Sequence, residues 1–383
     1  MQMTPSQSIL HMERSGIREI FDLANTIPDA IHLEMGEPNF DTPRHVVAAA
    51  AAAASNGYTK YTPNAGLPEL RAAVARKVTE RNGLTSSPEQ VIVTPGAIAA
   101  LYGTLLALCD SGDEILLPDP AWPNYRMIAA LQGLQVGTYP LLTDSGRFDV
   151  DAFERSITSR SKVVVVNSPN NPTGTMLDEQ SIKAMVQIAD ARGLWVISDE
   201  VYDEIVFDRD VAPSVAALGG SDNVVSVYSF SKTYAMTGWR VGYAVAPPDL
   251  VSYVVKTQEP ITACVNAPAQ MAAVAALDGP QTCVTEMRDA YRERRDRVVE
   301  LLVDAGVPHL HPAATFYVWV DVSASGLSGQ DFARRLLHEH HVAVTPGGAF
   351  GRAGTDHVRL SLASAPADLY QGVKSLAAAV IGR

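Results

Sequence analysis

The chain has 383 residues, which corresponds to two or three domains at a typical size of about 150 residues and excludes a single small binding module. Hydrophobic residues make up 47% and charged residues 19% of the sequence, a balance that excludes disordered, collagen-like and coiled-coil chains. Forty-two acidic residues against 30 basic ones give a net charge of -12, the wrong sign for a protein that binds the phosphate backbone of a nucleic acid. Any anionic ligand must therefore be held by a local site.

The N-terminal segment, residues 1–20, carries neither the apolar core nor the leading basic cluster of a signal peptide, which favours a cytoplasmic location. The longest apolar stretch, residues 46–54, is far shorter than the ~18 residues that a membrane span requires, so no membrane partner is expected. Its alanines instead predict a helix that packs closely on a neighbour. Residues 1–40 are too short to fold alone, and we expect them to pack on a second domain.

From residue 65 to residue 250, short β-branched runs alternate with longer helical patterns, which predicts a parallel sheet wrapped by crossover helices. The predicted strands are residues 90–94, 114–117, 163–167, 194–198, 224–228 and 241–246. Four consecutive valines, at 163–166, predict a strand that is buried on both faces in the middle of the sheet.

The pattern changes after about residue 280. A charge-rich helix is predicted over residues 286–302, followed by strands at 316–322, 341–345 and 357–362. These elements indicate a smaller α+β domain, and the cleft between two domains is the default place for a ligand.

Glycines and polar side chains gather in the segments that flank the predicted strands, chiefly after their carboxyl ends, where open α/β sheets bind ligands. In chain order, the candidate residues in these segments are Gly96, Ala97, Trp122, Asn171, Asp199, Tyr202, Ser229, Ser231, Lys232 and Arg240.

Lys232 follows an apolar strand, so its ammonium group could be shielded from solvent, which lowers the pKa of a lysine and frees the amine as a nucleophile. On position alone a surface lysine is the more common case. The hydroxyls of Ser229 and Ser231, the helix start at Gly96 and the guanidinium of Arg240 together supply the parts of a phosphate site. This context favours the nucleophile over the surface lysine.

Asp199 directly follows the fourth strand and is expected at the edge of the sheet. A buried carboxylate needs a cationic partner, and a protonated pyridine nitrogen would be one. Trp122 offers a face on which a pyridine ring could stack, and the phenol of Tyr202 could bond to a ring oxygen. The alternative, in which Asp199 caps a helix and Tyr202 packs in the core, is equally consistent with the two residues taken singly.

Residues 229–242, which read SFSKTYAMTGWRVG, resemble the lysine signature of the class I/II aminotransferases, enzymes that use pyridoxal 5'-phosphate. Further segments are similar to the family's other motifs in the same order, namely residues 33–38, 61–67, 167–174, 199–202 and 358–361. One glycine-rich match would be weak evidence, whereas six motifs in the family's order are specific.

The resemblance implies the fold-type I fold of pyridoxal-phosphate transferases, an α/β architecture. A large domain with a mostly parallel sheet wrapped by helices is joined to a smaller α+β domain. The implied divisions are an N-terminal arm with part of the small domain (1–40), a large cofactor-binding domain (41–280) and a small C-terminal domain (281–383).

The resemblance also implies a role for each candidate. Lys232 would bind the cofactor covalently and then move a proton at the substrate Cα, while Asp199 would keep the pyridine nitrogen protonated. Tyr202 and Asn171 would bond to the ring oxygen, and Trp122 would stack on the ring. The residues implied to hold the phosphate are Gly96, Ala97, Ser229, Ser231 and Arg240.

Partner and substrate contacts are implied as well. Tyr61 would reach the phosphate of the neighbouring subunit, which implies a homodimer. Arg359 would bind the substrate carboxylate through a bidentate fork. The implied substrate-binding residues are Gly36, Asn171, Arg359, Ile17 and Trp122, with Ile17 either part of an apolar lid or a core residue of its helix.

One position departs from the family. In one aspartate-type branch a lysine that pairs with the distal carboxylate of the substrate stands where this chain has Ile98, and an isoleucine cannot make that pair. An aspartate preference is thereby weakened, although Arg14 or Arg18 could reach the side chain instead.

The leading hypothesis is an aminotransferase that moves an amino group between an L-amino acid and a 2-oxo acid by a ping-pong mechanism through pyridoxamine phosphate. A lyase or synthase acting at Cβ or Cγ uses the same fold and lysine, and this alternative stays open. A regulator's ligand-sensing module is disfavoured, because the N-terminus is too short for a basic DNA-binding extension. A nicotinamide enzyme is disfavoured because no G-x-G-x-x-G follows a strand at the needed place. The cysteines and histidines show no metal-ligand spacing, so no metal is assigned.

Overall fold

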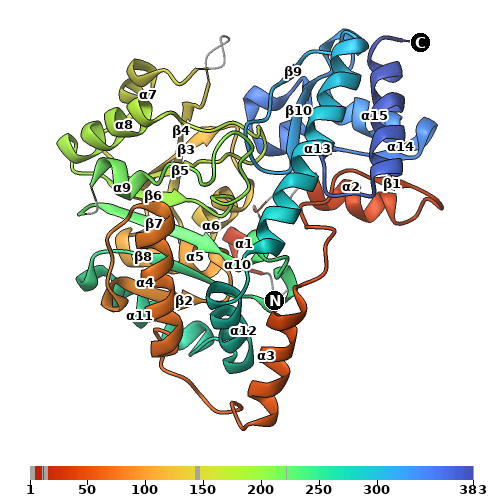
Figure 1. The fold of residues 1–383 in the computed structure, drawn as a ribbon. Coiled ribbons are helices and arrows are strands. Elements are labelled where there is room, and N and C mark those ends of the chain that lie inside the picture. Colours follow the sequence, from red (N-terminus) through yellow and green to blue (C-terminus); the bar gives the residue numbers. More distant parts are fainter. Residues whose placement is uncertain (1–4, 11, 13–15, 143–146, 221, 383) are drawn as a thin grey trace, which may run out of the picture.

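The computed structural model describes residues 5–10, 12, 16–142, 147–220 and 222–382 (Figure 1). In this part of the chain the largest sheet has seven strands. In spatial order they are β2 (Val91–Thr94), β8 (Gly242–Val245), β7 (Val224–Ser229), β6 (Trp195–Asp199), β5 (Ser161–Asn167), β3 (Glu114–Asp119) and β4 (Gln135–Pro140). All neighbours pair in parallel except β8, which is antiparallel to β2 and β7. The predicted mostly parallel sheet is confirmed.

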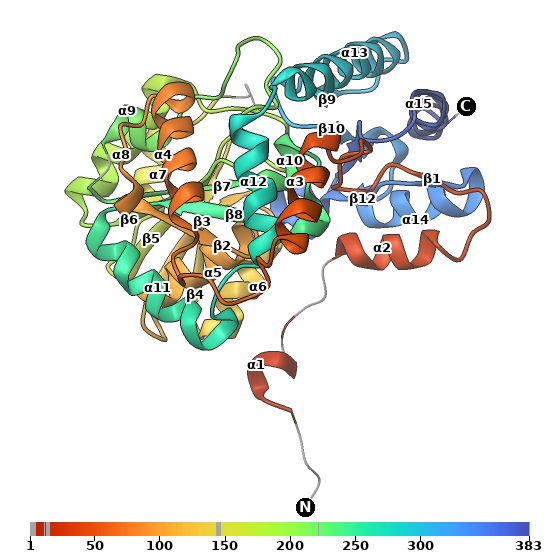
Figure 2. The ribbon, with the colours of Figure 1, turned by 60° about the horizontal axis from the view of Figure 1, so that its bottom comes forward.

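Helices cover both faces of this sheet (Figure 2). On one face lie α5 (Ala97–Leu108), α6 (Asn124–Gln132) and α11 (Pro248–Thr262). On the other lie α3 (Arg44–Ser55), α4 (Pro68–Asn82), α7 (Val150–Ser156), α8 (Glu179–Ala191), α9 (Val215–Gly219) and α12 (Ala267–Asp278). In β5, Val163 and Val165 belong to the first apolar layer and Val164 and Val166 to the second, because successive side chains of a strand alternate between its faces.

The six strands predicted between residues 90 and 246 are confirmed, with bounds that differ by no more than two residues. The sequence missed β4, which lies at the edge of the sheet and buries only Tyr139 fully. Its polar residues and Gly137 interrupt the apolar pattern by which strands are recognised.

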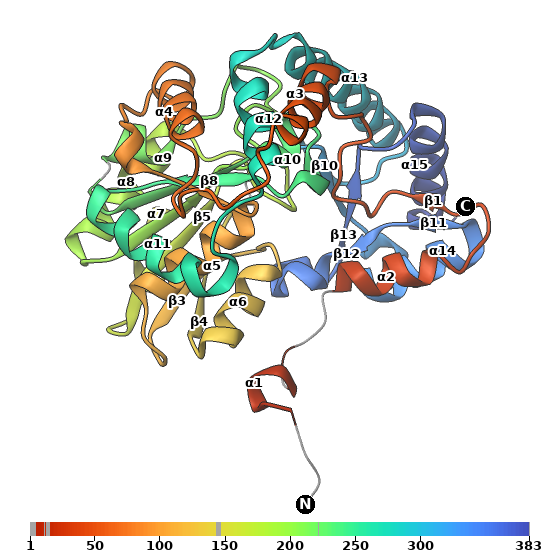
Figure 3. The ribbon, with the colours of Figure 1, turned by 90° about the horizontal axis from the view of Figure 1, so that it is seen from below.

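A second body beside the sheet is built from both ends of the chain (Figure 3). Its antiparallel sheet has the order β12 (Thr345–Pro346), β13 (His357–Ser361), β10 (Tyr317–Asp321) and β9 (His309–Leu310). The helices α13 (Thr282–Asp304), α14 (Gly329–His340) and α15 (Pro366–Val380) pack with it. From the N-terminal part, α2 (Gly16–Ala24) lies near α14, and β1 (Ile31–His32) pairs in parallel with β11 (Val342–Ala343).

The strand predicted over residues 341–345 is divided in two. His341 has a φ of 54°, a left-handed conformation that ends α14, and β11 and β12 then pair with different strands. The remaining short elements are α1 (Gln7–Leu10), α10 (Phe230–Thr233) and 3-10 turns at Pro88–Gln90, Thr237–Trp239, Ser323–Ser325, Gly347–Phe350 and Arg352–Gly354.

The alanine-rich helix α3 lies side by side with α12, which is itself rich in alanine (Figure 3). The predicted close packing of residues 46–54 on a neighbouring helix is confirmed. In the described part of the chain no helix is both long and apolar enough to cross a membrane.

We propose that the chain divides at about residues 40 and 280, as the sequence predicts. The apolar clusters support this division, because those on the two faces of the large sheet draw mainly on residues 46–284 and the third draws mainly on residues 20–33 and 287–380.

Candidate active site

A cavity of about 410 Å³ opens where β5, β6 and β7 end. The second body closes it from the opposite side with residues of β10 and β13. Twelve of the 14 site residues predicted from the sequence line it, namely Ile17, Gly36, Ala97, Trp122, Asn171, Asp199, Tyr202, Ser229, Ser231, Lys232, Arg240 and Arg359. The fold thus brings together predicted site residues that lie more than 300 positions apart in the sequence.

Lys232 lies on α10, directly after β7, and its Nζ donates a hydrogen bond to the carbonyl oxygen of Gly36 at 2.6 Å. Burial disfavours the charged ammonium and lowers the pKa of Lys232 to about 8, although the nearby carboxylate of Glu37 opposes this shift. A lysine with this pKa has an appreciable fraction of neutral, nucleophilic amine near neutral pH.

Asp199 ends β6 beside Asn167 of β5, and 3% of its surface is exposed. Its Oδ2 accepts a 2.5 Å hydrogen bond from the hydroxyl of Tyr125. Burial raises the pKa of Asp199 to about 6. No cationic side chain of the described residues forms an ion pair with this carboxylate, so it is placed to receive a cationic group from a ligand.

Arg359 lies in β13 with 1% of its surface exposed. Its Nη1 donates to Oδ1 of Asn171 at 2.9 Å, and its Nη2 donates to the carbonyl oxygen of Glu34 at 2.7 Å. Its Nε is buried and has no hydrogen-bond partner among the described residues. Burial lowers the pKa of this guanidinium, and no carboxylate of the described residues pairs with it. A buried cation of this kind is suited to an anionic ligand.

Tyr202 and Tyr317 meet across the cavity, with their hydroxyl oxygens 3.2 Å apart. Burial raises the pKa of Tyr202 well above its ordinary value. Gly36 lies against this pair, since a Cβ at Gly36 would come within 2.7 Å of the Tyr317 hydroxyl. The position therefore excludes any larger side chain unless Tyr317 moves.

The start of α5 packs against Arg240. A Cβ at Gly96, whose φ is +78°, would lie 2.5 Å from Nη2 of Arg240, so Gly96 packs behind the guanidinium rather than lining the cavity. Ser229 and Ser231 lie nearby, with the Ser229 hydroxyl accepting from the backbone N–H of Ser231 at 3.1 Å. A helix start, two hydroxyls and a guanidinium suit a phosphate group.

Tyr61 lies away from this cavity. Its surface is 91% exposed, and with residues 58–60 and 264–268 it borders a separate hollow of about 320 Å³. Arg18 also faces away, because its exposed side chain pairs with Asp22 at 3.4 Å, and Arg14 falls outside the described residues.

The sequence missed several lining residues, namely Asn124, Tyr125, Asn167, Val201, Thr237 and Tyr317. Asn167 and Thr237 fall inside motifs that were recognised, and Asn167 ties two strands together by donating to the carbonyl oxygen of Asp199 at 3.0 Å. Tyr125 lies three residues after Trp122, and their rings make an edge contact with 5.5 Å between centroids. Tyr317 carried no signal, because it lies in a strand of the other body.

The lining has the charge and shape of a specific ligand site. Among the described residues it includes three basic side chains, Lys232, Arg240 and Arg359, against one acidic side chain, Asp199. These groups suit an anionic ligand that has a carbonyl that an amine can attack and a basic ring nitrogen.

Comparisons with known proteins agree with this chemistry. A family model described as aminotransferase class I and II matches residues 28–376. An aspartate aminotransferase of Pyrococcus abyssi is 38% identical over 92% of this chain and 92% of its own length. Aromatic-amino-acid aminotransferase 2 of Thermococcus litoralis is 36% identical, with 95% of each chain covered. The solved structure of the aspartate aminotransferase from Thermus thermophilus with maleate superposes with a TM-score of 0.94 at 34% identity, covering 99% of this chain and 100% of that one.

Proposed function

Because the chain belongs to the class I and II aminotransferases, it is a pyridoxal-phosphate-dependent aminotransferase, and we propose roles in that reaction for the residues that line its cavity. The relatives reported above are all named aminotransferases, and nothing in them favours the lyase or synthase alternative. When bound, the cofactor supplies an electron-accepting ring that stabilises negative charge at the substrate Cα.

The proposal depends on one observation. A single cavity brings together the amine of Lys232, the carboxylate of Asp199 and the guanidinium of Arg359. Asp199 and Arg359 are buried, Lys232 is half-buried, and none of the three has an ion-pair partner among the described residues. We assign Lys232 to the covalent attachment of the cofactor and to proton transfer at the substrate Cα. Asp199, oriented by Tyr125, holds the proton of the ring nitrogen.

Arg359 binds the substrate carboxylate in this proposal. Asn171 supports it in two ways, since its Oδ1 orients the guanidinium and its amide nitrogen is left to donate to the substrate or the ring oxygen. The Tyr202 hydroxyl donates to the ring oxygen, and Trp122 stacks on the ring. Ala97, Ser229, Ser231 and Arg240 bind the phosphate, with Gly96 packed behind Arg240.

Chemical trapping tests the assignment of Lys232. Reduction of the holoenzyme with borohydride, followed by proteolysis and mass spectrometry, should find the cofactor on the peptide that contains Lys232. A label on any other lysine, or no label at all, would reject the assignment.

We propose further that the preferred amino acid has an uncharged side chain. The basic residues of the lining already have roles, and Arg18 faces away. Beyond Ile98 and Asn124, which both cavities share, lies a second hollow of about 270 Å³ lined mainly by apolar residues such as Tyr102, Met127 and Leu131. Relatives include aspartate and aromatic-amino-acid aminotransferases, and this lining supports the second kind of substrate.

A half-reaction screen tests the side-chain proposal. Holoenzyme is mixed with single amino acids, and the loss of the absorbance of the lysine-bound cofactor is followed. Phenylalanine or leucine should react at least ~10-fold more efficiently than aspartate, as a difference of about 1–3 kcal/mol in side-chain contacts implies. Faster reaction with aspartate would contradict the proposal.

We also propose a homodimer in which Tyr61 reaches the cofactor phosphate of the partner subunit. The almost complete exposure of this large side chain beside a surface hollow supports an interface there. The cytoplasmic location stays a prediction, which fractionation of cells that express the protein would test.

A further inference from the structure

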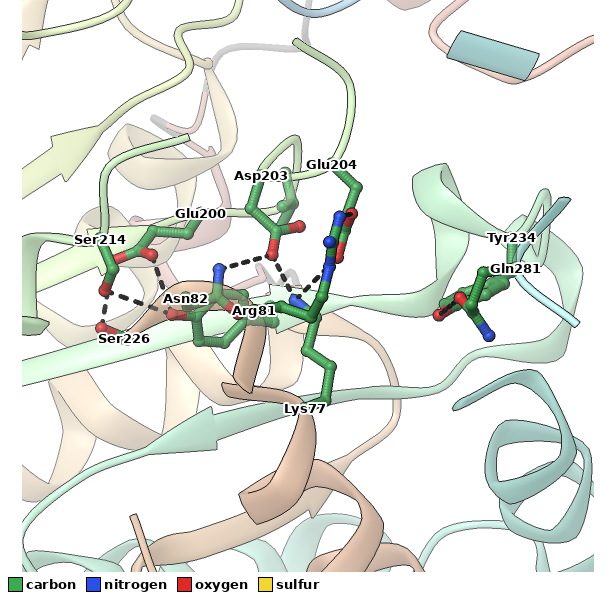
Figure 4. A network of polar contacts seen from close by, with 12 residues as sticks. Lys77, Arg81, Asn82, Glu200, Asp203, Glu204, Ser214, Ser226, Tyr234 and Gln281 are labelled. Carbon is green, nitrogen blue, oxygen red and sulfur yellow. Dashed lines mark hydrogen bonds and ion pairs between the residues drawn. The ribbon is translucent and has the colours of Figure 1, made fainter. Parts of the chain in front are cut away.

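A second cluster of charged side chains, most of them buried or half-buried, takes no part in the reaction described above (Figure 4). We call it the α4 anchor and define it as Lys77, Arg81 and Asn82 of α4 together with Glu200, Asp203 and Glu204 of the turn that follows β6. Figure 4 shows the side chains from α4 reaching toward Asp203 and Glu204.

Ion pairs and hydrogen bonds join α4 to this turn. The Nζ of Lys77 donates to Oδ2 of Asp203, which also accepts from Nδ2 of Asn82 at 3.0 Å. Lys77 lies 3.7 Å from Oε1 of Glu204, and Nη2 of Arg81 lies 3.0 Å from Oε2 of Glu204. Lys77, Asp203 and Glu204 expose only 10%, 4% and 6% of their side chains, so solvent screens these pairs little. Burial opposes the charge on Lys77, yet attraction by Asp203, Tyr243 and Glu204 outweighs it and raises the pKa of Lys77.

Glu200 is held by donors alone. Its Oε1 accepts from the hydroxyls of Ser198 at 2.8 Å, Ser226 at 3.1 Å and Ser214 at 3.3 Å, and from the backbone N–H of Val215 at 3.2 Å. Its Oε2 accepts from the hydroxyl of Tyr228 at 2.8 Å. The ring of Tyr228 in turn lies 5.0 Å from the Nζ of Lys77, which joins Glu200 to the rest of the anchor. Four of these five groups are hydroxyls, which can also accept a hydrogen bond, whereas the Val215 N–H can only donate.

Residues 199–204 present two faces. Asp199, Val201 and Tyr202 line the active-site cavity. Glu200, Asp203 and Glu204 point the other way, into the layer that contains α4 and α9. Asp199, Glu200 and Val201 continue the alternation of β6, in which Ile197 belongs to the apolar layer of α5 and Val196 to that of α4, and the alternation ends at Tyr202. Glu200, Asp203 and Glu204 therefore each lie within a few positions of a residue that lines the active-site cavity.

Residues 200–204 belong to no helix or strand, and the N–H of Glu200 joins their backbone to the sheet by donating to the carbonyl oxygen of Val227 at 2.8 Å. Buried ion pairs contribute little net stability compared with apolar packing, but they fix geometry when all their hydrogen bonds are made. The ion pairs of the α4 anchor therefore suit a role in fixing the position of the turn better than a role in stabilising the protein.

We propose that Lys77 and Glu200 are positioning residues that hold Asp199 and Tyr202 in register with the ring of the cofactor. The inference depends on the functions proposed above for Asp199 and Tyr202. The α4 anchor acts through them and contacts neither cofactor nor substrate.

The test compares three variants of α4. Lys77→Met keeps the length of the side chain and removes its charge, Lys77→Arg restores a cation, and Arg76→Met is the matched control. Arg76 lies on the same helix and makes an ion pair of 2.7 Å, but with Asp278 of α12 rather than with the turn. In each holoenzyme one measures kcat, KM and the apparent pKa of the visible absorbance of the lysine-bound cofactor. The affinity of each apo-protein for pyridoxal phosphate is titrated separately.

For Lys77→Met we expect kcat to fall about ten-fold with KM changed less than about three-fold, since substrate contacts are intact and ring contacts are displaced. The apparent pKa of the absorbance should move by about 0.5 or more. Lys77→Arg should recover most of both values, and Arg76→Met should match the unmodified enzyme.

Lys77→Met leaves Asp203 buried without a cation, whereas Glu204 keeps Arg81. If this variant does not fold, the double variant Lys77→Met/Asp203→Asn, which also removes the charge of Asp203, is used instead. Glu200→Gln offers an independent test and should move the absorbance pKa as well, since it removes the carboxylate around which four hydroxyls and one backbone N–H are arranged. Lower thermal stability with unchanged kcat and unchanged absorbance pKa in these variants would overturn the proposal.

Asp199→Asn in the same assays distinguishes failure of the function proposed for Asp199 from failure of the positioning role proposed for the α4 anchor. Full turnover and an unchanged absorbance pKa in that variant would reject the function proposed for Asp199. Altered values there, with unaltered ones in the anchor variants, would reject the positioning role alone.

Discussion

Lys232, Asp199 and Arg359 are individually unfavourable residues for a protein interior. Asp199 and Arg359 are buried and Lys232 is half-buried, and none of the three forms an ion pair with another described residue. Such groups destabilise the protein without its ligands and are retained where function requires them. The consequences can be measured one residue at a time.

Lys232→Ala should abolish covalent attachment of the cofactor and lower kcat by at least about a thousand-fold, because both the nucleophile and the proton carrier are lost. The thermal midpoint of the apo-protein should not fall, since a buried charge is removed. Lys256→Ala, at an exposed lysine, is the control. Mass spectrometry after borohydride reduction checks attachment, and turnover within ten-fold of the control would refute the assignment.

Asp199→Asn should stabilise the apo-protein in a pH-dependent manner. The pKa of Asp199 is about 6 in the folded chain against an ordinary 3.8. Stability is therefore lost as pH rises from about 3.8 to about 6, and the full penalty, up to about 3 kcal/mol, remains above that range. The gain from the substitution should be small near pH 4.5 and largest at pH 7–8. Denaturant unfolding at both pH values measures it, and a gain that does not grow with pH would contradict the burial argument.

Arg359→Lys keeps the charge but removes the planar fork that holds a carboxylate through two hydrogen bonds. We expect KM to rise about 10–100-fold for every amino acid tested, with a smaller effect on kcat. Arg335→Lys, at an exposed ion pair of 2.9 Å with Glu339, is the matched control. Steady-state kinetics on two unrelated amino acids checks this, and a KM within two-fold of the control would remove the carboxylate-binding role.

The site residues that could be predicted from the sequence are those that stand inside local motifs. Lys232, Asp199 and Asn171 each stand in a pattern of neighbours whose chemistry can be read without coordinates. Tyr125 and Tyr317 could not be found in this way. Each matters through a partner distant in sequence, since Tyr125 donates to Asp199 and Tyr317 meets Tyr202.

Alanine residues on α3 and α12 allow these two helices to pack closely. Val46, Ala50 and Ala53 of α3 are buried, and Ala272 of α12 is fully buried. Small side chains on both helices leave no room for a larger one.

Ala272→Leu should therefore destabilise the apo-protein by about 1–3 kcal/mol through overpacking. Ala51→Leu, on the exposed face of α3, should change stability by less than about 0.5 kcal/mol. Thermal or denaturant unfolding of both variants measures the difference, and equal effects would show that the helices can separate without cost.

The elements that the sequence predicted are those with a strong apolar run. The strands of the sheet interior were found within two residues, whereas the edge strand β4 and the two-residue strands β1 and β9 were not. A two-residue strand has too few side chains to set a period, and it exists because a distant partner pairs with it. The antiparallel direction of β8 was likewise not predicted, because composition does not encode direction.

For the whole molecule, the proposed dimer makes a prediction of its own. If Tyr61 acts across the interface, a Tyr61→Ala subunit and a Lys232→Ala subunit should form a heterodimer with one intact site and one doubly altered site. Co-expression should then restore roughly a quarter of the wild-type activity, because about half of the dimers are mixed and each has one of two sites. Activity no higher than the sum of the two separately expressed variants would place Tyr61 in its own subunit's site or outside any site.

Residues 34–36 illustrate how the ends of the chain depend on each other. The carbonyl of Gly36 accepts from Lys232, and the carbonyl of Glu34 accepts from Arg359. One short stretch of main chain thus accepts hydrogen bonds from both the amine of Lys232 and the guanidinium of Arg359. A shortened protein that begins after residue 40 would lose both acceptors together, and Lys232 and Arg359 would each lose a hydrogen-bond partner in the same cavity.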